Sequence, residues 1–139
     1  MRDTSSGEGT IGFRAKEAVG FIEDELAVPE KASFVNSEGV RIEAWLYRPL
    51  GPAAPDPGER APLIVYYYGG ASPTLRGLNG LHQFLVANGY ALYVLNPRGA
   101  AGYGRDFADV HVNDWGQKAG QYILEGVEDL LRREPWIDP

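Results

Sequence analysis

The stretch "PLIVYYYGGASP", residues 62–73, decides the fold class, because an apolar run ends on three tyrosines and then breaks at two glycines. Residues 63–68 are continuously apolar or aromatic, which is typical of a strand covered on both faces. Gly69 and Gly70 indicate a sharp turn directly after that strand. The tyrosines raise a question of function, since each buried phenol hydroxyl must find a hydrogen-bond partner.

The elements that follow this strand alternate between helix and strand. Residues 78–90 have apolar side chains at helical spacing, and Gly89 is placed to end that helix. A second buried strand is predicted over 91–96, a glycine-rich loop over 97–107, and an amphipathic helix over 115–133 with Asp114 as its N-cap. Strand, helix, strand, helix predicts a largely parallel sheet of the α/β class. The apolar positions of the two helices are Leu78, Leu81, Leu85 and Val86 in the first and Ile123, Val127, Leu130 and Leu131 in the second.

The segment before residue 62 predicts an antiparallel hairpin. Two strand-like runs within 32–49 flank the turn residues Asn36-Ser37-Glu38-Gly39, and the second run alternates apolar with polar or aromatic residues, which indicates one wetter face. The five prolines of 49–62 predict a surface loop. Ahead of the hairpin, 15–26 fits a short helix with Val19, Ile22 and Leu26 on one face, and 1–12 is expected to be disordered.

The segment "EPWIDP" (134–139) follows the second helix, where an α/β fold should continue with a strand. No such strand is predicted within the 139 residues. The sheet would then keep an open edge, which isolated domains avoid. We therefore expect an incomplete domain.

The composition excludes several classes of function. Thirteen basic against nineteen acidic residues give a net charge of −6, which disfavours nucleic acid and membrane surfaces as partners. The chain has no cysteine, so disulfides, thiol catalysis and cysteine-based zinc sites are excluded, and its two histidines are far apart. No cofactor and no metal are expected. With neither a signal peptide nor a long apolar run in the sequence, we expect a cytoplasmic location.

Three motifs that suggest catalysis or cofactor binding have better structural explanations. Gly99, Gly102 and Gly104 run G-x-x-G-x-G rather than the dinucleotide-binding G-x-G-x-x-G, so we interpret them as a tight loop. Ser72 is followed by proline and lies outside any G-x-S-x-G elbow. His82 and His111 are expected to be partly buried or surface residues. A complete catalytic triad cannot be assembled from these residues.

Four blocks of the sequence together resemble a known family. The blocks are "EGVRIEAWLYRP", "PLIVYYYGGASP", "FLVANGYALYVLNPRGAAGYGRDF" and "NDWGQKAGQYILEGVEDLLRREPWIDP". In order and spacing they resemble the first part of the catalytic domain of the prolyl oligopeptidase family, whose members are serine peptidases with the α/β-hydrolase fold. The resemblance runs from about residue 32 to residue 139. In the family, the strand with the G-x-S-x-G elbow follows directly, and the Asp and His of the triad come later.

The resemblance implies a role for the last tyrosine of the run. In the family, the loop after this strand supplies part of the oxyanion hole, and some members use a tyrosine hydroxyl there. It thus implies that Tyr68 is an oxyanion donor, with Gly69 and Gly70 forming its loop. The alternative is a core tyrosine with a satisfied hydroxyl. Tyr66 and Tyr67 are expected to be packing residues.

Other residues are expected to have structural roles. Arg98 resembles a family arginine that anchors its loop by hydrogen bonds. Trp115 and Trp136 are expected to pack in the core.

The predicted organisation is a disordered tail and linker helix over 1–31, then the N-terminal half of an α/β-hydrolase domain over 32–139. The function implied is that of a serine peptidase that cleaves peptide bonds through an acyl-enzyme. This segment would supply the oxyanion loop without the triad and would be inactive alone. Expected partners are a peptide substrate, the remaining C-terminal half of the domain and, in the full protein, a β-propeller. Two alternatives stay open: an esterase on the same fold, and a non-catalytic fragment that pairs with the missing half.

Overall fold

The computed structural model describes residues 26–67, 79–111, 113, 114 and 116–139. The hairpin region contains β1 (Glu30–Lys31), β2 (Phe34–Val35) and β3 (Arg41–Tyr47). A 3₁₀ turn, η2 (Gly51–Ala53), lies in the proline-rich loop. Then come β4 (Ala61–Tyr67), α2 (Gly80–Ala87), β5 (Ala91–Asn96), α3 (Arg105–Ala108), η3 (Asp109–His111), α4 (Gln117–Arg133) and β6 (Ile137–Asp138).

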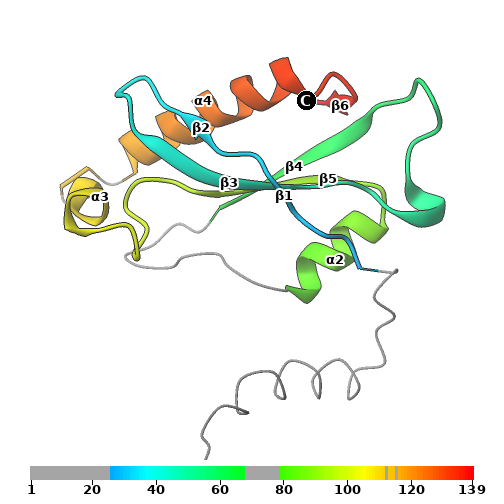
Figure 1. The fold of residues 1–139 in the computed structure, drawn as a ribbon, viewed down its shortest axis with the longest axis horizontal. Coiled ribbons are helices and arrows are strands. Elements are labelled where there is room, and N and C mark those ends of the chain that lie inside the picture. Colours follow the sequence, from blue (N-terminus) through cyan, green and yellow to red (C-terminus); the bar gives the residue numbers. More distant parts are fainter. Residues whose placement is uncertain (1–25, 68–78, 112, 115) are drawn as a thin grey trace, which may run out of the picture.

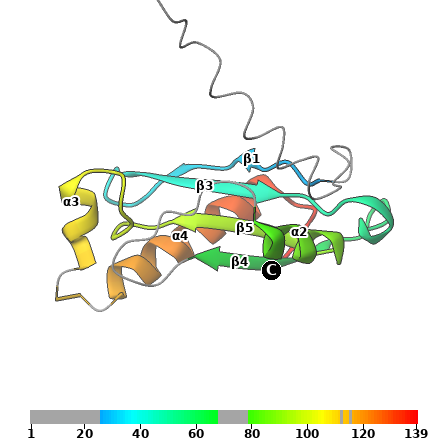
Figure 2. The same cartoon turned by 90° about the horizontal axis from the view of Figure 1, so that it is seen from below.

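The strands form one mixed sheet in the order β1-β3-β5-β4-β6, and β2 also pairs with β3. The strand β3 is antiparallel to β1, β2 and β5, whereas β4 is parallel to both β5 and β6. The helices α4 and α2 cover opposite faces of this sheet (Figures 1 and 2). The predicted α/β class and the predicted hairpin are therefore confirmed.

The buried strand β5 explains why the sequence alternates so little there. All six of its residues are buried. Tyr93 and Leu95 belong to the core under α4, which also contains Ile123 and Leu130 of that helix. Leu92 and Val94 belong to a second core, under α2. A strand with a helix on each face needs an apolar residue at every position.

Two expectations about neighbouring strands were wrong in part. The face of β3 expected to be wetter carries Trp45 and Tyr47, which pack into the core under α2; Tyr47 is 5% exposed. The strand β4, expected to be covered on both faces, is only half-buried at most positions, and Tyr67 is 50% exposed. Along the described residues, its second edge pairs only at Ala61 and Pro62, so little packs beside the rest of the strand.

An α/β fold should continue with a strand after α4, but the sequence pattern indicates none within the 139 residues. The structure shows that a short strand, β6, does follow α4. In β6, Ile137 lies opposite Ala61 and Asp138 opposite Pro62, in parallel. Two residues are too short a run for periodicity to reveal. At the other edge, β1 pairs with β3, so the sheet starts just before the predicted boundary at residue 32.

The helices differ from expectation in detail. The first one has Asn79 as its N-cap, with its side chain accepting from the Leu81 amide at 2.9 Å. His82 is buried on its inner face, whereas Leu81, expected in the core, is 49% exposed. The helix α4 begins at Gln117, and Asp114, the predicted N-cap, accepts from the Lys118 amide at 2.9 Å. Of the predicted helix over 15–26, only Leu26 is among the described residues, and it lies in a bend and not in a helix. Leu78 and Trp115 lie outside the described residues. In the part of the chain that the structure describes, none of the helices is long and apolar enough to cross a membrane.

A glycine sets how closely α4 approaches the sheet. A Cβ added at Gly126 would lie 2.6 Å from the Phe34 ring and 2.9 Å from the Leu95 side chain. Gly120, in the same helix, has nothing within 4 Å of its Cβ position. The glycine at 126 thus lowers the helix propensity of α4 but permits direct contact with the sheet.

We expect Gly126→Ala to lower the free energy of unfolding by about 1–2 kcal/mol, because overpacking outweighs the gain of roughly 1 kcal/mol in helix propensity. Gly120→Ala is the matched control and should raise stability by up to about 1 kcal/mol. Urea unfolding of both variants and the parent chain provides the measurement. Equal stabilisation by the two alanines would contradict the close packing at residue 126.

Candidate functional site

The carboxyl ends of two parallel strands, β4 and β5, define the candidate site. Tyr66 lies opposite Val94 and Tyr67 opposite Leu95, so both strands end at the same edge of the sheet. In open α/β sheets, ligands bind beyond this edge. The residue that follows β4 is Tyr68, which lies outside the described residues together with Gly69, Gly70 and Ser72.

A buried asparagine ends β5 and begins a hydrogen-bonded chain across the sheet. Asn96 is 1% exposed, and its Nδ2 donates to the Tyr103 hydroxyl at 2.9 Å. The Tyr103 hydroxyl donates to Oε2 of Glu43 at 2.9 Å. In the sheet, Glu43 lies directly opposite Asn96. None of these three residues is predicted from the sequence as part of a site, although a polar residue at the end of an apolar strand is a usable signal.

The glycine-rich loop after β5 has a conformation that needs its glycines. Gly99, Gly102 and Gly104 have φ angles of 103°, 92° and 94°, which are unfavourable for other residues. The Gly99 amide donates to the Phe107 carbonyl at 2.8 Å and thus closes the loop. The angles explain why these positions are glycines, and the Gly99 amide is already used within the loop, which fits the structural interpretation.

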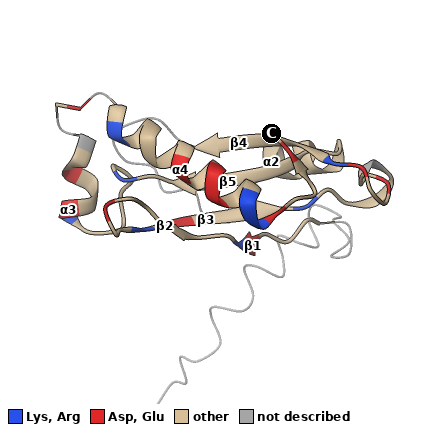
Figure 3. Ribbon diagram, turned by 90° about the horizontal axis from the view of Figure 1, so that it is seen from above, with Lys and Arg blue, Asp and Glu red and all other residues tan. Residues whose placement is uncertain are grey.

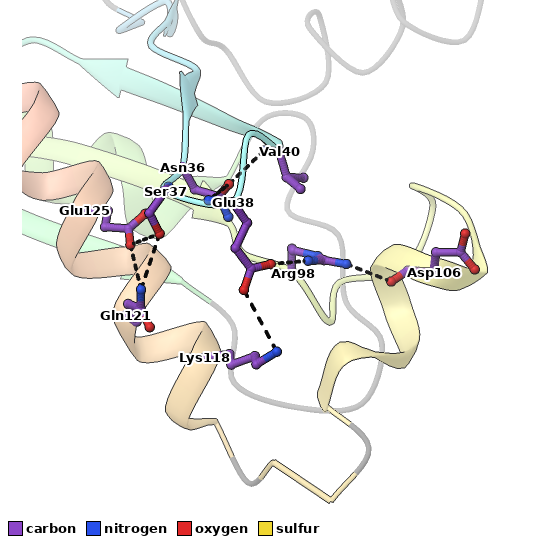
Figure 4. Close-up of polar contacts among 9 residues, drawn as sticks. All are labelled: Asn36, Ser37, Glu38, Val40, Arg98, Asp106, Lys118, Gln121 and Glu125. Atoms are coloured by element: carbon purple, nitrogen blue, oxygen red, sulfur yellow. Dashed lines mark hydrogen bonds and ion pairs between the residues drawn. The ribbon is translucent and has the colours of Figure 1, made fainter.

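Arg98 joins this loop to the hairpin turn (Figure 4). Its Nη1 donates to Oε2 of Glu38 at 2.7 Å, and its Nη2 donates to the Asp106 carbonyl at 3.1 Å. The arginine side chain is 17% exposed. These are the contacts that a loop anchor makes, and they occupy both terminal nitrogens of the guanidinium. The anchoring role remains a proposal.

The turn that carries Glu38 is itself fixed from two sides. Asn36 Oδ1 accepts from the amides of Glu38 at 3.1 Å and Val40 at 2.8 Å. Ser37 donates to the Glu125 carboxylate of α4 twice, from its hydroxyl at 2.6 Å and from its amide at 2.8 Å. These two bonds, with a third from Gln121, hold the pKa of Glu125 below its usual range. The hairpin turn therefore connects the loop of Arg98 to α4.

His82 lies on the other face of the sheet, away from the Arg98 network. It is 3% exposed, and its ring stands edge-on to Tyr66 at 4.7 Å and to Tyr47 at 5.5 Å between centroids. Within the described residues, neither ring nitrogen makes a hydrogen bond, and burial lowers the pKa of the imidazole. A general base needs a partner that orients it, and none of the described side chains orients His82 in this way. Its contact with Tyr66 agrees with the packing role predicted for that tyrosine.

The remaining candidates add no second site. Trp136 is half-buried, and the Arg48 guanidinium lies 4.6 Å from its ring centroid, which fits the expected packing role. The side chain of His111 is not described. Among the described residues, no group of three or more potential metal ligands occurs.

A mixed sheet with a helix on each face and the parallel pair β4–β5 (Figure 1) is consistent with an incomplete α/β-hydrolase fold. Among solved structures, the acylaminoacyl peptidase of Pyrococcus horikoshii, in its orthorhombic crystal form, matches with a TM-score of 0.73 and 32% identity. That match covers 81% of this chain and 18% of the peptidase.

Sequence comparisons agree with the structural one. The model of the prolyl oligopeptidase family matches residues 78–139. The uncharacterized peptidase YuxL of Bacillus subtilis (strain 168) is 35% identical over 120 residues, covering 84% of this chain and 18% of that protein. Dipeptidyl-peptidase 5 of Schizosaccharomyces pombe is 33% identical over 112 residues, covering 78% of this chain and 16% of that protein. Together these matches show that the chain belongs to the prolyl oligopeptidase family. It spans less than a fifth of the length of these relatives.

The buried imidazole predicts a pH dependence of stability. In the unfolded chain, His82 is protonated near its ordinary pKa of about 6.5. In the folded chain, burial lowers the pKa of His82, so protonation requires a lower pH. Stability is therefore fully present above pH 6.5 or so and is lost as the pH falls below it. We expect the free energy of unfolding, measured by urea titration, to decrease as the pH falls below about 6.5.

The variant His82→Phe keeps an aromatic ring between the two tyrosines and removes the titrating group, so it should flatten this part of the pH profile. His111→Phe removes the one other imidazole of the chain, so comparing the two variants separates the contribution of His82 from that of His111. An unchanged slope in His82→Phe would show that other groups cause the pH dependence.

Proposed function

We propose that this chain forms the first part of the catalytic domain of a serine peptidase of the prolyl oligopeptidase type. The observation that carries the proposal is the shared carboxyl edge of β4 and β5, where Tyr67 is level with Leu95 and residue 68 comes next. Names of relatives such as acylaminoacyl peptidase and dipeptidyl-peptidase 5 favour a peptide as substrate. In the complete enzyme, a serine would attack the peptide carbonyl and form an acyl-enzyme.

In this proposal Tyr68 donates its hydroxyl to the oxygen that becomes negative in the transition state, and Gly69-Gly70 allow the turn that carries it. A phenol fixed at the end of a strand is a preorganised donor, which needs no rearrangement during the reaction. Arg98 would help indirectly, because its bonds to Glu38 and to the Asp106 carbonyl hold the neighbouring loop in place.

The position of β6 favours a nucleophile from the part of the protein that would follow this chain. Since Ile137 pairs with Ala61 in parallel, about five further residues in the same register would reach the level of Tyr67. A turn at that point would lie beside residue 68, and a serine there would meet the proposed donor. The first test is to read the coding sequence beyond Pro139: a G-x-S-x-G motif within about 15 residues supports the proposal, and a stop codon opposes it.

We expect the 139-residue chain alone to be inactive, because no triad can be assembled from its residues. Purified protein should show no turnover of activated esters or peptide anilides above the background rate. A fluorophosphonate probe tests the same point independently, since it labels only activated serines. Labelling that disappears in Ser72→Ala would contradict the prediction.

The role of Tyr68 is tested in the full-length enzyme. Tyr68→Phe keeps the ring and removes one hydrogen bond made in the transition state, so kcat should fall by roughly 10²–10³ with little change in KM. Tyr66→Phe and Tyr67→Phe are matched controls from the same strand and should keep kcat. Melting temperatures of all three variants separate catalysis from stability. If all three keep kcat within a few-fold, Tyr68 is a structural tyrosine.

A further inference from the structure

The helix α2 is apolar on both of its sides. Its eight residues, Gly80–Ala87, include no charged residue. His82 and Val86 face the sheet and are buried, yet Leu81 and Phe84 on the outer side are 49% and 63% exposed. A helix at a protein surface normally has a polar outer face, whereas one that is apolar all round is covered on both sides.

The helix on the opposite face of the sheet has the ordinary pattern. The outer side of α4 carries both acidic and basic residues (Figure 3). Its one large exposed apolar residue, Leu124, is 66% exposed and lies next to Glu125. A single exposed leucine is common at protein surfaces. Leu81 and Phe84 differ because residues three apart on a helix are neighbours and form a continuous patch.

The chain preceding the sheet already contacts α2. The Ala27 amide donates to Oε1 of Gln83 at 2.8 Å, and Nε2 of Gln83 donates to the Ala27 carbonyl at 3.0 Å. Ala27 is 6% exposed and belongs to the core under α2. Gln83 thus holds the backbone by a donor and an acceptor at once. The chain is therefore held beside this helix at Ala27, just before it enters the sheet.

We propose that residues 15–25 form a helix that packs against the outer face of α2. In the sequence "AKEAVGFIEDE", helical spacing places Ala15, Val19 and Ile22 on one side and most of the charged residues on the other. Leu26 follows in a bend that leads to Ala27. Eleven residues make a helix of about 16 Å, longer than the roughly 12 Å of α2. The interface that begins at Gln83 and Ala27 would then continue over Phe84, and burial of both apolar faces would stabilise it.

Disulfide trapping tests the contact in the full 139-residue chain, which has no cysteine of its own. Ile22→Cys combined with Phe84→Cys or with Leu81→Cys should give an intramolecular disulfide in at least one pair, because a disulfide needs Cα atoms within about 7 Å. Asp24→Cys with Phe84→Cys is the matched control, since residue 24 lies on the charged side. Ile22→Cys with Leu124→Cys, across the sheet, is a second control.

Non-reducing gels and mass spectrometry distinguish the possible occupants of this face. A disulfide within one chain, absent in both controls, supports the proposal. A disulfide between two chains would mean that a second copy covers α2, and no disulfide in either test pair would mean that the segment before Leu26 does not pack on this face. Both results overturn the proposal.

Hydrogen exchange provides a measurement that needs no cysteine. If residues 15–25 pack on α2, their amides should be protected, and Phe84→Ser should make them exchange roughly tenfold faster. Leu124→Ser removes an equally exposed apolar side chain from the other helix and should leave them unchanged. Equal exchange in both variants and the parent chain would also overturn the proposal.

Discussion

The structure depends on one strand, β5, that is paired along both edges and covered on both faces. Its antiparallel partner β3 brings the hairpin into the sheet, and its parallel partner β4 brings the candidate site to the sheet edge. Because its side chains alternate between the core under α4 and the core under α2, β5 also fixes where the two helices lie. A polar residue at an interior position such as Tyr93 or Val94 would therefore disturb a sheet pairing and a helix contact together.

The sequence predicts those parts of the fold that depend on local contacts, and it does not predict those that depend on distant parts of the chain. The hairpin and α4 were predicted, because turn residues and apolar periodicity are visible in one stretch of sequence. The exposure of Leu81 and the burial of His82 were not, since they depend on which side of α2 meets strands from elsewhere in the chain. The two-residue strands β1 and β6 were missed for a related reason: each is defined by its partner and not by a pattern of its own.

For the candidate site, the sequence suggests individual residues and their proposed roles, but it does not show which residues contact one another. Tyr68 came from family resemblance and from its place at the end of a strand, and an anchoring role for Arg98 came from the same source. The partner of Arg98 could not be predicted, because Glu38 lies 60 residues earlier and no pattern links the two. The chain from Asn96 through Tyr103 to Glu43 was missed for the same reason, since it crosses between strands that are remote in sequence.

The hydrogen bonds around the hairpin turn have a consequence for the order of folding. Arg98 and Glu38 are 60 residues apart, and Ser37 and Glu125 are 88 apart. Contacts between such distant residues carry a loop-closure cost that must be met before they form, so they arise only once strands and helix are already aligned. We therefore expect the loop beside the candidate site to form its own short-range bonds first and to be joined to the hairpin turn late. The hairpin turn can form early because its own hydrogen bonds join residues that are close in sequence. Its bonds to α4 and to the loop of Arg98 form afterwards.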